Sequence, residues 1–178
     1  MPMEEKTFGE YGARVQERLE GFYGIRVVTR DIPDPLTGDL DGAEIDIDYA
    51  ASAEERLFLL AHLFGHTVQW NVDARAFEIG KPHQPPVDES LLPAIVAYER
   101  EAAMYALWML HEIGITEADQ WFCDYTACDM AYLLHFYRSG EKRSFRSFWR
   151  YGSQLIEPRS VPRFTPEKRR FRLDGIVI

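Results

Sequence analysis

The chain of 178 residues is acidic, with a formal net charge of -9 at pH 7, and 46% of its residues are hydrophobic. This length and apolar content are sufficient for one domain with a sizeable core, and they exclude a disordered chain. The negative charge argues against direct binding of nucleic acid, because phosphate contacts need clustered Lys and Arg. Basic residues do gather in residues 157–178, and we expect this tail to lie back on the acidic body of the protein.

No stretch of the sequence indicates a membrane segment. The first twelve residues lack the apolar core of a signal peptide, and the apolar stretch 105–110 is too short to span a bilayer. We therefore expect a soluble cytoplasmic protein that makes no contact with a membrane. The two cysteines, Cys123 and Cys128, form no CxxC pair, so we expect buried free thiols.

The first half of the chain predicts two helices and two strands. Apolar residues at helical spacing predict the first helix, and β-branched residues after a glycine predict the first strand. Strict alternation predicts a second strand with one buried face, and a serine followed by two glutamates marks the start of the second helix. In chain order these elements are helix 8–22, strand 24–32, a turn-rich loop 31–42, strand 43–49, and a helix from Ser52 through Trp70.

The second half predicts mainly helix, followed by an extended tail. Prolines make 73–90 a loop, two long helices follow, and three further prolines keep the tail extended. We expect the aromatic residues of the second long helix to pack in the core. Together the elements predict an α+β fold in which a small sheet lies beside several helices. The expected elements are helices 91–113 and 117–138, a short helix within 144–155, and a strand-like end at 175–178.

The segment 59–70, LLAHLFGHTVQW, contains a possible metal-binding pair. His62 and His66 are four residues apart, so both project from one helical face and could reach a metal at about 2 Å. A pair of this kind more often packs than binds a metal, and a binding site needs a third ligand from another element. Glu99 and Glu101 lie in an otherwise apolar helix, and because they are only two apart, one of them is expected to face the histidines.

Residues 57–69, LFLLAHLFGHTVQ, resemble the active-site helix of the ImmA/IrrE family of metallopeptidases, in which an apolar run precedes A-H-E-x-G-H. Residues 99–110, EREAAMYALWML, resemble that family's next signature. A strand precedes the histidine helix in the family, as one is predicted to do in this chain. The resemblance covers 8–113, whereas 117–178 reads as a helical extension with a basic tail. It implies a zincin-like histidine helix within a single domain.

The resemblance also implies which side chains would hold zinc or a similar divalent ion. His62 and His66 match the two histidine ligands of the family. Glu101 matches the third ligand, because it directly precedes an alanine, as the glutamate of the family signature does, and lies four residues before Tyr105, which stands where the signature has an aromatic residue. Further candidates near this site are Glu99, His83 and Tyr105.

Two residues depart from the family pattern. Ala103 replaces an asparagine or aspartate, and Leu63 stands where the family carries its general base. Leucine transfers no proton, and general acid–base catalysis typically contributes about 10²–10⁴-fold. The sequence therefore predicts a metal-binding but catalytically inactive homologue that acts as a binding or regulatory protein, with a peptide or protein as its partner.

Two alternatives remain open from the sequence. One is an active zinc-dependent peptidase or hydrolase with a non-standard base. Glu55 lies about 10 Å upstream along the helix, too far to act as that base unless the chain folds back, whereas His83 in the proline-rich loop could approach as a fourth ligand or as the base. The other is a metal-free scaffold in which both histidines pack.

Overall fold

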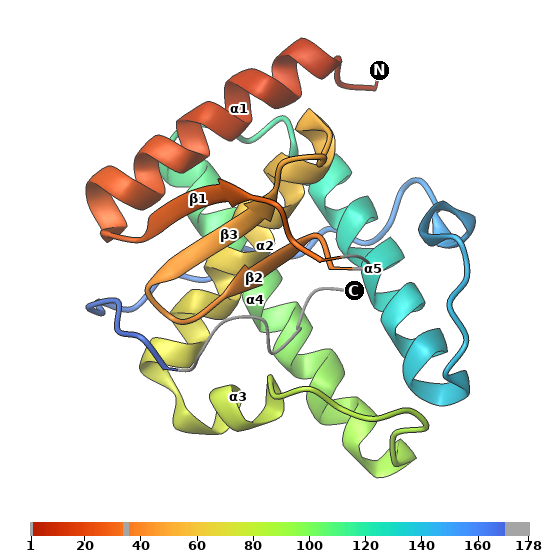
Figure 1. The fold of residues 1–178 in the computed structure, drawn as a ribbon. Helices are drawn as coiled ribbons and strands as arrows, with labels where there is room; N and C mark the ends of the chain where they lie inside the picture. The colour runs from red at the N-terminus through yellow and green to blue at the C-terminus, as the bar shows by residue number, and fades with distance from the viewer. Residues whose placement is uncertain (1, 34–35, 170–178) are drawn as a thin grey trace.

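The computed structural model describes residues 2–33 and 36–169 of the chain. Within them, a small mixed sheet has the strand order β1-β3-β2, with β1 parallel and β2 antiparallel to β3. Figure 1 shows this sheet in front of α2, with α1 along the β1 edge and α5 at the right of the view. The predicted α+β class is confirmed. The strands are β1 (Arg26–Arg30), β2 (Gly38–Leu40) and β3 (Glu44–Asp48), and the helices around them are α1 (Glu5–Arg18), α2 (Ala53–Val72), α4 (Leu92–Glu112) and α5 (Asp119–Ser139).

Helix α2 is the central element of the core. It begins with the predicted N-cap, where the Ser52 hydroxyl accepts from the backbone N–H of Glu55 and the Glu55 carboxylate accepts from the backbone N–H of Ser52. Every residue from 57 to 70 is buried, because the sheet, α1 and α4 cover the helix from several sides. Such burial around the whole circumference explains why the sequence has an apolar run here rather than a single apolar stripe.

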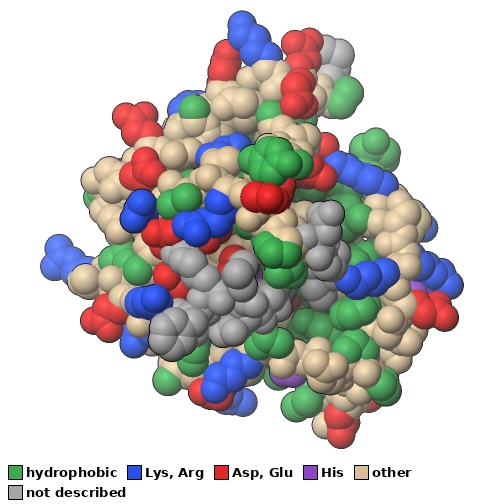
Figure 2. Space-filling view, viewed as in Figure 1, with side chains coloured by type: hydrophobic (Ala, Val, Ile, Leu, Met, Phe, Trp, Pro, Cys, Tyr) green, Lys and Arg blue, Asp and Glu red, His purple; other side chains and the backbone are tan. Residues whose placement is uncertain are grey.

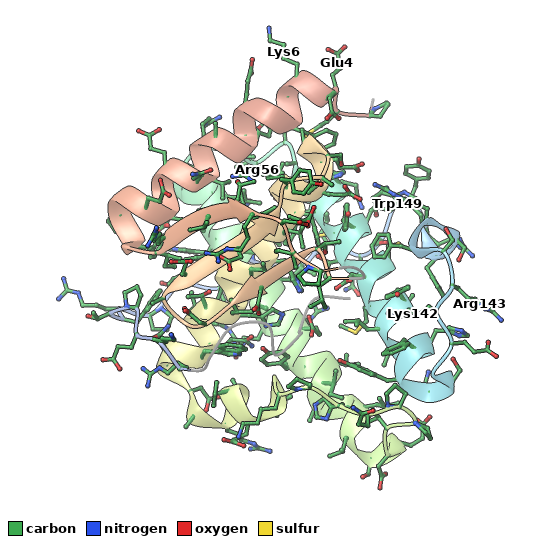
Figure 3. All side chains as sticks on the ribbon, viewed as in Figure 1. Glu4, Lys6, Arg56, Lys142, Arg143 and Trp149 are labelled. Carbon is green, nitrogen blue, oxygen red and sulfur yellow. The ribbon has the colours of Figure 1, made fainter. Side chains whose placement is uncertain are left out.

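Arg56 joins α2 to its neighbours at the protein surface, as Figure 3 shows. Its guanidinium donates to Thr29 Oγ1 of β1 at 3.0 Å and to Gln16 Oε1 of α1 at 2.7 Å. These two hydrogen bonds tie the first turn of α2 to β1 and α1, six and ten residues before His62 and His66.

The long helices match their predicted positions to within a few residues, whereas two short elements lie inside predicted loops. Strand β2 falls within the expected loop 31–42, and helix α3 (Ala74–Ile79) falls within the expected loop 73–90. The backbone N–H of Arg75 donates to the Asp73 side chain, which caps α3, and the first proline comes only after the helix has ended. The predicted helix 8–22 begins earlier and ends in a π-helical turn, Leu19–Tyr23, before Gly24 in the left-handed conformation.

The described part of the basic tail, residues 157–169, lies back on the body of the protein, as predicted, and residues 170–178 lie outside the described residues. The Arg159 guanidinium donates to Glu101 Oε2 at 2.6 Å, and its backbone N–H donates to the carbonyl of Met104 at 3.1 Å. Further along, the backbone N–H of Arg169 donates to the carbonyl of Asp41 at 2.6 Å. A short 3-10 turn, Phe145–Phe148, stands where a short helix was expected, and the strand-like segment 175–178 lies outside the described residues.

The surface carries both signs of charge. On the face shown in Figure 2, acidic and basic side chains are interspersed. Cys123 and Cys128 are buried free thiols, as predicted. Among the helices of the described residues, none has the length and apolar character needed to cross a membrane.

Candidate metal site

The candidate site lies where α2 and α4 approach most closely. Gly65 of α2 faces the backbone of Ala102 on α4, and a Cβ atom added at Gly65 would lie 2.1 Å from the Ala102 carbonyl oxygen. Only glycine permits this approach. On α2, His62 lies three residues before Gly65 and His66 directly follows it, and on α4 Glu99 lies one turn before Ala102, so the close approach brings these three side chains together.

The three side chains aim their donor atoms at one point. His66 Nε2 lies 3.2 Å from His62 Nε2 and 3.1 Å from Glu99 Oε2, and His62 Nε2 lies 3.7 Å from Glu99 Oε2. Zinc sites are mostly tetrahedral with metal–donor bonds of about 2.0–2.1 Å, which places donors about 3.3 Å apart. Within the described residues, this is the group of three His, Cys, Asp or Glu side chains that could hold a metal ion. The donor set and its spacing fit zinc.

A chain of hydrogen bonds sets the orientation of the His66 ring. Its Nδ1 lies 2.9 Å from Gln69 Oε1, an acceptor, so Nδ1 donates to Gln69 and Nε2 is the ring atom that faces His62 and Glu99. The Gln69 amide in turn donates to the Tyr98 carbonyl at 2.9 Å and to Glu101 Oε1 at 3.0 Å, which fixes which end of the amide faces the histidine. Outer partners of this kind are typical of metal-binding histidines.

Aromatic rings fix the planes of both imidazoles. Phe58 stacks on His62 with ring centroids 5.2 Å apart, and Tyr98 stacks on His66 at 4.4 Å. The two imidazoles are perpendicular to each other. Because each ring is held between its own helix and an aromatic neighbour, the donor atoms are positioned before any ion arrives.

Burial determines the charge of the site. Desolvation, helped by the neighbouring His66, lowers the pKa of His62 to about 4, so His62 is neutral at pH 7 and can offer a lone pair. Burial alone would raise the pKa of Glu99, but His66 and His62 outweigh it and lower that pKa, so Glu99 is ionised. His62 and Glu99 are therefore in the protonation states that a divalent metal requires of these ligands.

The structure places Glu99, not Glu101, beside the histidines. Glu101 accepts from Gln69 and from Arg159 on the flank of α4, away from the point where the donors meet. The physical reason is the helical repeat. Glu99 is three residues before Ala102, which places both on the face packed against α2, whereas Glu101 is one residue before Ala102 and is rotated by about 100° from Ala102. The choice of Glu101 as third ligand, made from the alanine that follows it, is corrected to Glu99.

The other candidates lie apart from the donor cluster. Tyr105 is buried on the Arg159 side of α4, where burial raises its pKa. His83 lies at the cavity next to the site, but its Nε2 is 2.8 Å from the carbonyl oxygen of Ile79. Glu55 also borders this cavity, and its carboxylate is engaged in the cap of α2.

Leu63 faces the sheet. It is fully buried, and its Cδ1 would touch a Cβ atom placed on Gly38 of β2 at 3.0 Å. Leu63 is not among the described residues that line the cavity. The position that carries the general base in the resembling family therefore holds hydrocarbon packed against strands.

A cavity of about 460 Å³ opens beside His62 and Glu99, between α2, α4 and α5. Asp129 of α5 lines it, and sequence reasoning missed this residue. Burial and the nearby Glu99 carboxylate raise the pKa of Asp129 well above its usual range. The helical repeat could have indicated this residue. Asp129 lies four residues after Tyr125 and three before Tyr132, so the three side chains share one face of α5, and both tyrosines line the same cavity.

Asp129→Asn is expected to stabilise the metal-free protein at pH 7.5 and to lose this advantage as the pH falls toward 4. The folded-state pKa of Asp129 is above the unfolded value, so protons bind the folded state more tightly and the ionised carboxylate disfavours folding. Urea unfolding with a chelator present, at pH 7.5 and 4.5, measures the difference from the unaltered protein. The exposed Glu141→Gln is the matched control, and a destabilised Asp129→Asn at pH 7.5 would contradict the assignment.

Comparisons with protein-family models, with curated proteins and with solved structures found no match. The interpretation of the site therefore depends on its own geometry and chemistry.

Proposed function

We propose that the protein binds one zinc or similar divalent ion through His62, His66 and Glu99, and acts as a non-catalytic binding or regulatory protein. The observation that supports this most directly is the convergence of three buried donor atoms at 3.1–3.7 Å. The Glu99 carboxylate is buried, and a buried carboxylate is costly unless a positive charge lies beside it, which a bound cation would supply. A bound ion would join α2 to α4 at the centre of the fold.

The type of ligand set supports zinc in particular. Two histidines and one carboxylate are a common zinc set that leaves a fourth coordination position open. The resemblance of residues 57–69 and 99–110 to the ImmA/IrrE metallopeptidases is consistent with it. When bound, such an ion polarises a carbonyl or acidifies a water molecule, and the residues of this chain decide whether that chemistry can be used.

The absence of a proton acceptor at position 63 supports a non-catalytic role. Leu63 packs against Gly38 and does not border the cavity among the described residues. His62 and His66 would direct their Nε2 lone pairs to the ion, which leaves neither free to transfer a proton at that atom. Under this proposal the cavity holds a ligand without cleaving it.

One observation favours a second candidate, an active hydrolase with an unusual base. Asp129 shares the cavity with His62 and Glu99, and its pKa is raised by burial and by Glu99, as is common for carboxyl groups that exchange protons in active sites. This candidate requires that the zinc-loaded protein cleave a peptide or ester, that a chelator abolish cleavage, and that Asp129→Asn reduce it by about 10²-fold or more. Cleavage that is unaffected by the chelator or by Asp129→Asn would reject it.

Zinc content tests the proposed function. We expect protein purified without chelators to hold one zinc per chain, and His62→Ala, His66→Ala and Glu99→Gln each to weaken zinc binding by at least about 100-fold. Glu101→Gln is the matched control: it lies two residues from Glu99 and keeps an oxygen that can accept from Gln69, so its effect should stay under about 10-fold. Elemental analysis and competition with a zinc-binding dye measure both quantities.

The same variants distinguish the proposal from a metal-free scaffold. If the histidines only pack, His66→Ala will lower the free energy of unfolding but leave zinc binding unaltered. Equal loss of zinc in Glu99→Gln and Glu101→Gln would also contradict the site as described. Zinc that fails to raise the melting temperature of the unaltered protein would remove the proposal.

A further inference from the structure

Residues 149–169, which we call the strap, cross the body of the protein after α5 without forming a helix or a strand. Figure 1 shows this segment, in blue, passing from the side of α5 to the opposite side of the molecule. Backbone N–H groups of the strap donate to three helices in turn: Ser153 to the Asp124 carboxylate of α5 at 2.7 Å, Arg159 to the Met104 carbonyl of α4 at 3.1 Å, and Glu167 to the Asn71 amide oxygen of α2 at 3.0 Å.

The side chain of Arg159 connects the strap to the support of the candidate metal site. Its Nη1 donates to Glu101 Oε2 at 2.6 Å, and the other oxygen of that carboxylate accepts from Gln69 Nε2 at 3.0 Å. Gln69 Oε1 in turn accepts from His66 Nδ1 at 2.9 Å. A continuous chain of hydrogen bonds therefore leads from a surface arginine to a buried candidate ligand, and it begins with a charge-assisted bond.

The position of Glu101 depends on this arginine. The Glu101 side chain is 31% exposed, so its carboxylate can turn to water once no cation holds it beside α4. Gln69 is only 1% exposed, and its amide would then keep the Tyr98 carbonyl as an acceptor but lose the Glu101 carboxylate. Because a buried N–H without an acceptor is costly, the Gln69 amide would shift, and the His66 ring that it holds would shift with it.

We propose that Arg159 is a positioning residue of the candidate metal site, and that docking of the strap on α4 strengthens metal binding through Glu101 and Gln69. This inference depends on the proposed metal binding at His66. The strap lies outside residues 8–113, to which the resemblance to the metallopeptidases is confined, so the connection is a feature of this chain. Coupling is reciprocal, and a bound ion should therefore hold the strap more tightly on α4.

Zinc affinity of strap variants, measured by dye competition, tests the inference. Arg159→Gln should weaken zinc binding by about 5-fold, less than the loss of a direct partner of a ligand, because Arg159 acts through two further side chains. Repulsion between the arginine and the ion would have the opposite sign, so that its removal would tighten binding. Arg159→Lys should bind zinc within about 2-fold of the unaltered protein, since one N–H···O bond to Glu101 is within the means of a lysine.

Two comparisons separate the connection from a general effect of the strap. Arg163→Gln is the matched control, because Arg163 is an exposed arginine of the same strap, and it should change zinc affinity by less than about 2-fold. In a Glu101→Ala background the chain of hydrogen bonds is already broken, so adding Arg159→Gln should weaken zinc binding no further than about 2-fold. Urea unfolding with a chelator present checks that each variant is folded.

Hydrogen exchange of the unaltered protein tests the reciprocal effect. Zinc should slow exchange of the Arg159 backbone N–H by about 5-fold, the same factor by which the arginine strengthens zinc binding. The backbone N–H of Ser153 is the control within the strap, because its acceptor is Asp124 of α5, which is not part of the chain that leads to His66, and zinc should leave its exchange rate unaltered.

The outcomes distinguish failure of this inference from failure of the proposed function. If the protein takes up no zinc, the metal site itself is wrong and so is the role of Arg159. The metal site stands and the positioning role is wrong if zinc binds with one ion per chain but Arg159→Gln does not weaken it. The same conclusion follows if Arg159→Lys binds zinc as weakly as Arg159→Gln, if the loss persists in the Glu101→Ala background, or if zinc slows exchange at Arg159 and Ser153 equally or at neither.

Discussion

Gly65→Ala is expected to destabilise the protein by at least about 3 kcal/mol and to weaken zinc binding at the same time. The added Cβ would lie 2.1 Å from the carbonyl oxygen and 2.6 Å from the carbonyl carbon of Ala102. Both are backbone atoms of a helix, so no side-chain rotation relieves the contact, and α2 and α4 must move apart. Such a movement separates His66 from Glu99, whose donor atoms now lie 3.1 Å apart.

Urea unfolding followed by circular dichroism measures the loss of stability, and dye competition measures the loss of zinc affinity. Gly9→Ala is the matched control because Gly9 is an exposed helical glycine in α1 with no atom within 4 Å of the added Cβ. That change should raise stability by about 0.5–1 kcal/mol, since alanine favours helix. A Gly65→Ala protein as stable as the unaltered chain would show that the two helices are not held by this contact.

The sequence was informative about the elements whose signals are local. The cap at Ser52 and the left-handed glycine after α5 are each specified by a few neighbouring residues, and the structure contains both. Strand β3 forms where it was predicted, but the expectation of a single buried face was wrong, because Asp46 on the opposite face is also buried, where its carboxylate pairs with Arg30. Strand β2 has three residues, among them a buried Asp39, and forms only because β3 supplies its hydrogen-bonding partner. No pattern within its own residues could have indicated it.

The candidate site shows the same division. The pairing of His62 with His66 follows from the helical repeat alone and could be predicted. Which glutamate joins the two histidines depends on which face of α4 packs against α2. That face is set by the contact between Gly65 and Ala102, which lie 37 residues apart in the chain. Resemblance to a family signature pointed to Glu101, whereas the spacing of Ala102 from Glu99 along the helix would have favoured the residue that the structure brings to the site.

The second large effect is expected from Leu63→Glu, which restores the residue type of the resembling metallopeptidases. We expect this change to destabilise the fold by about 3–5 kcal/mol and to produce no hydrolysis. Leu63 is fully buried and packs against Gly38 of β2, so a glutamate there would place a charge among apolar side chains. The destabilisation should shrink at low pH, where the new carboxyl is protonated in both the folded and unfolded states.

Leu63→Met provides the control, because it conserves volume and apolar character and should cost less than about 1.5 kcal/mol. Urea unfolding at pH 7.5 and 4.5, together with an assay for chelator-sensitive peptide cleavage, measures both parts of the prediction. A stable Leu63→Glu protein that cleaves peptide in a zinc-dependent manner would mean that the side chain at position 63 turns away from Gly38 and reaches the ion. The site would then be a peptidase frame that lacks only its base, and the packing of Leu63 against the sheet would no longer be a reason to expect a non-catalytic role.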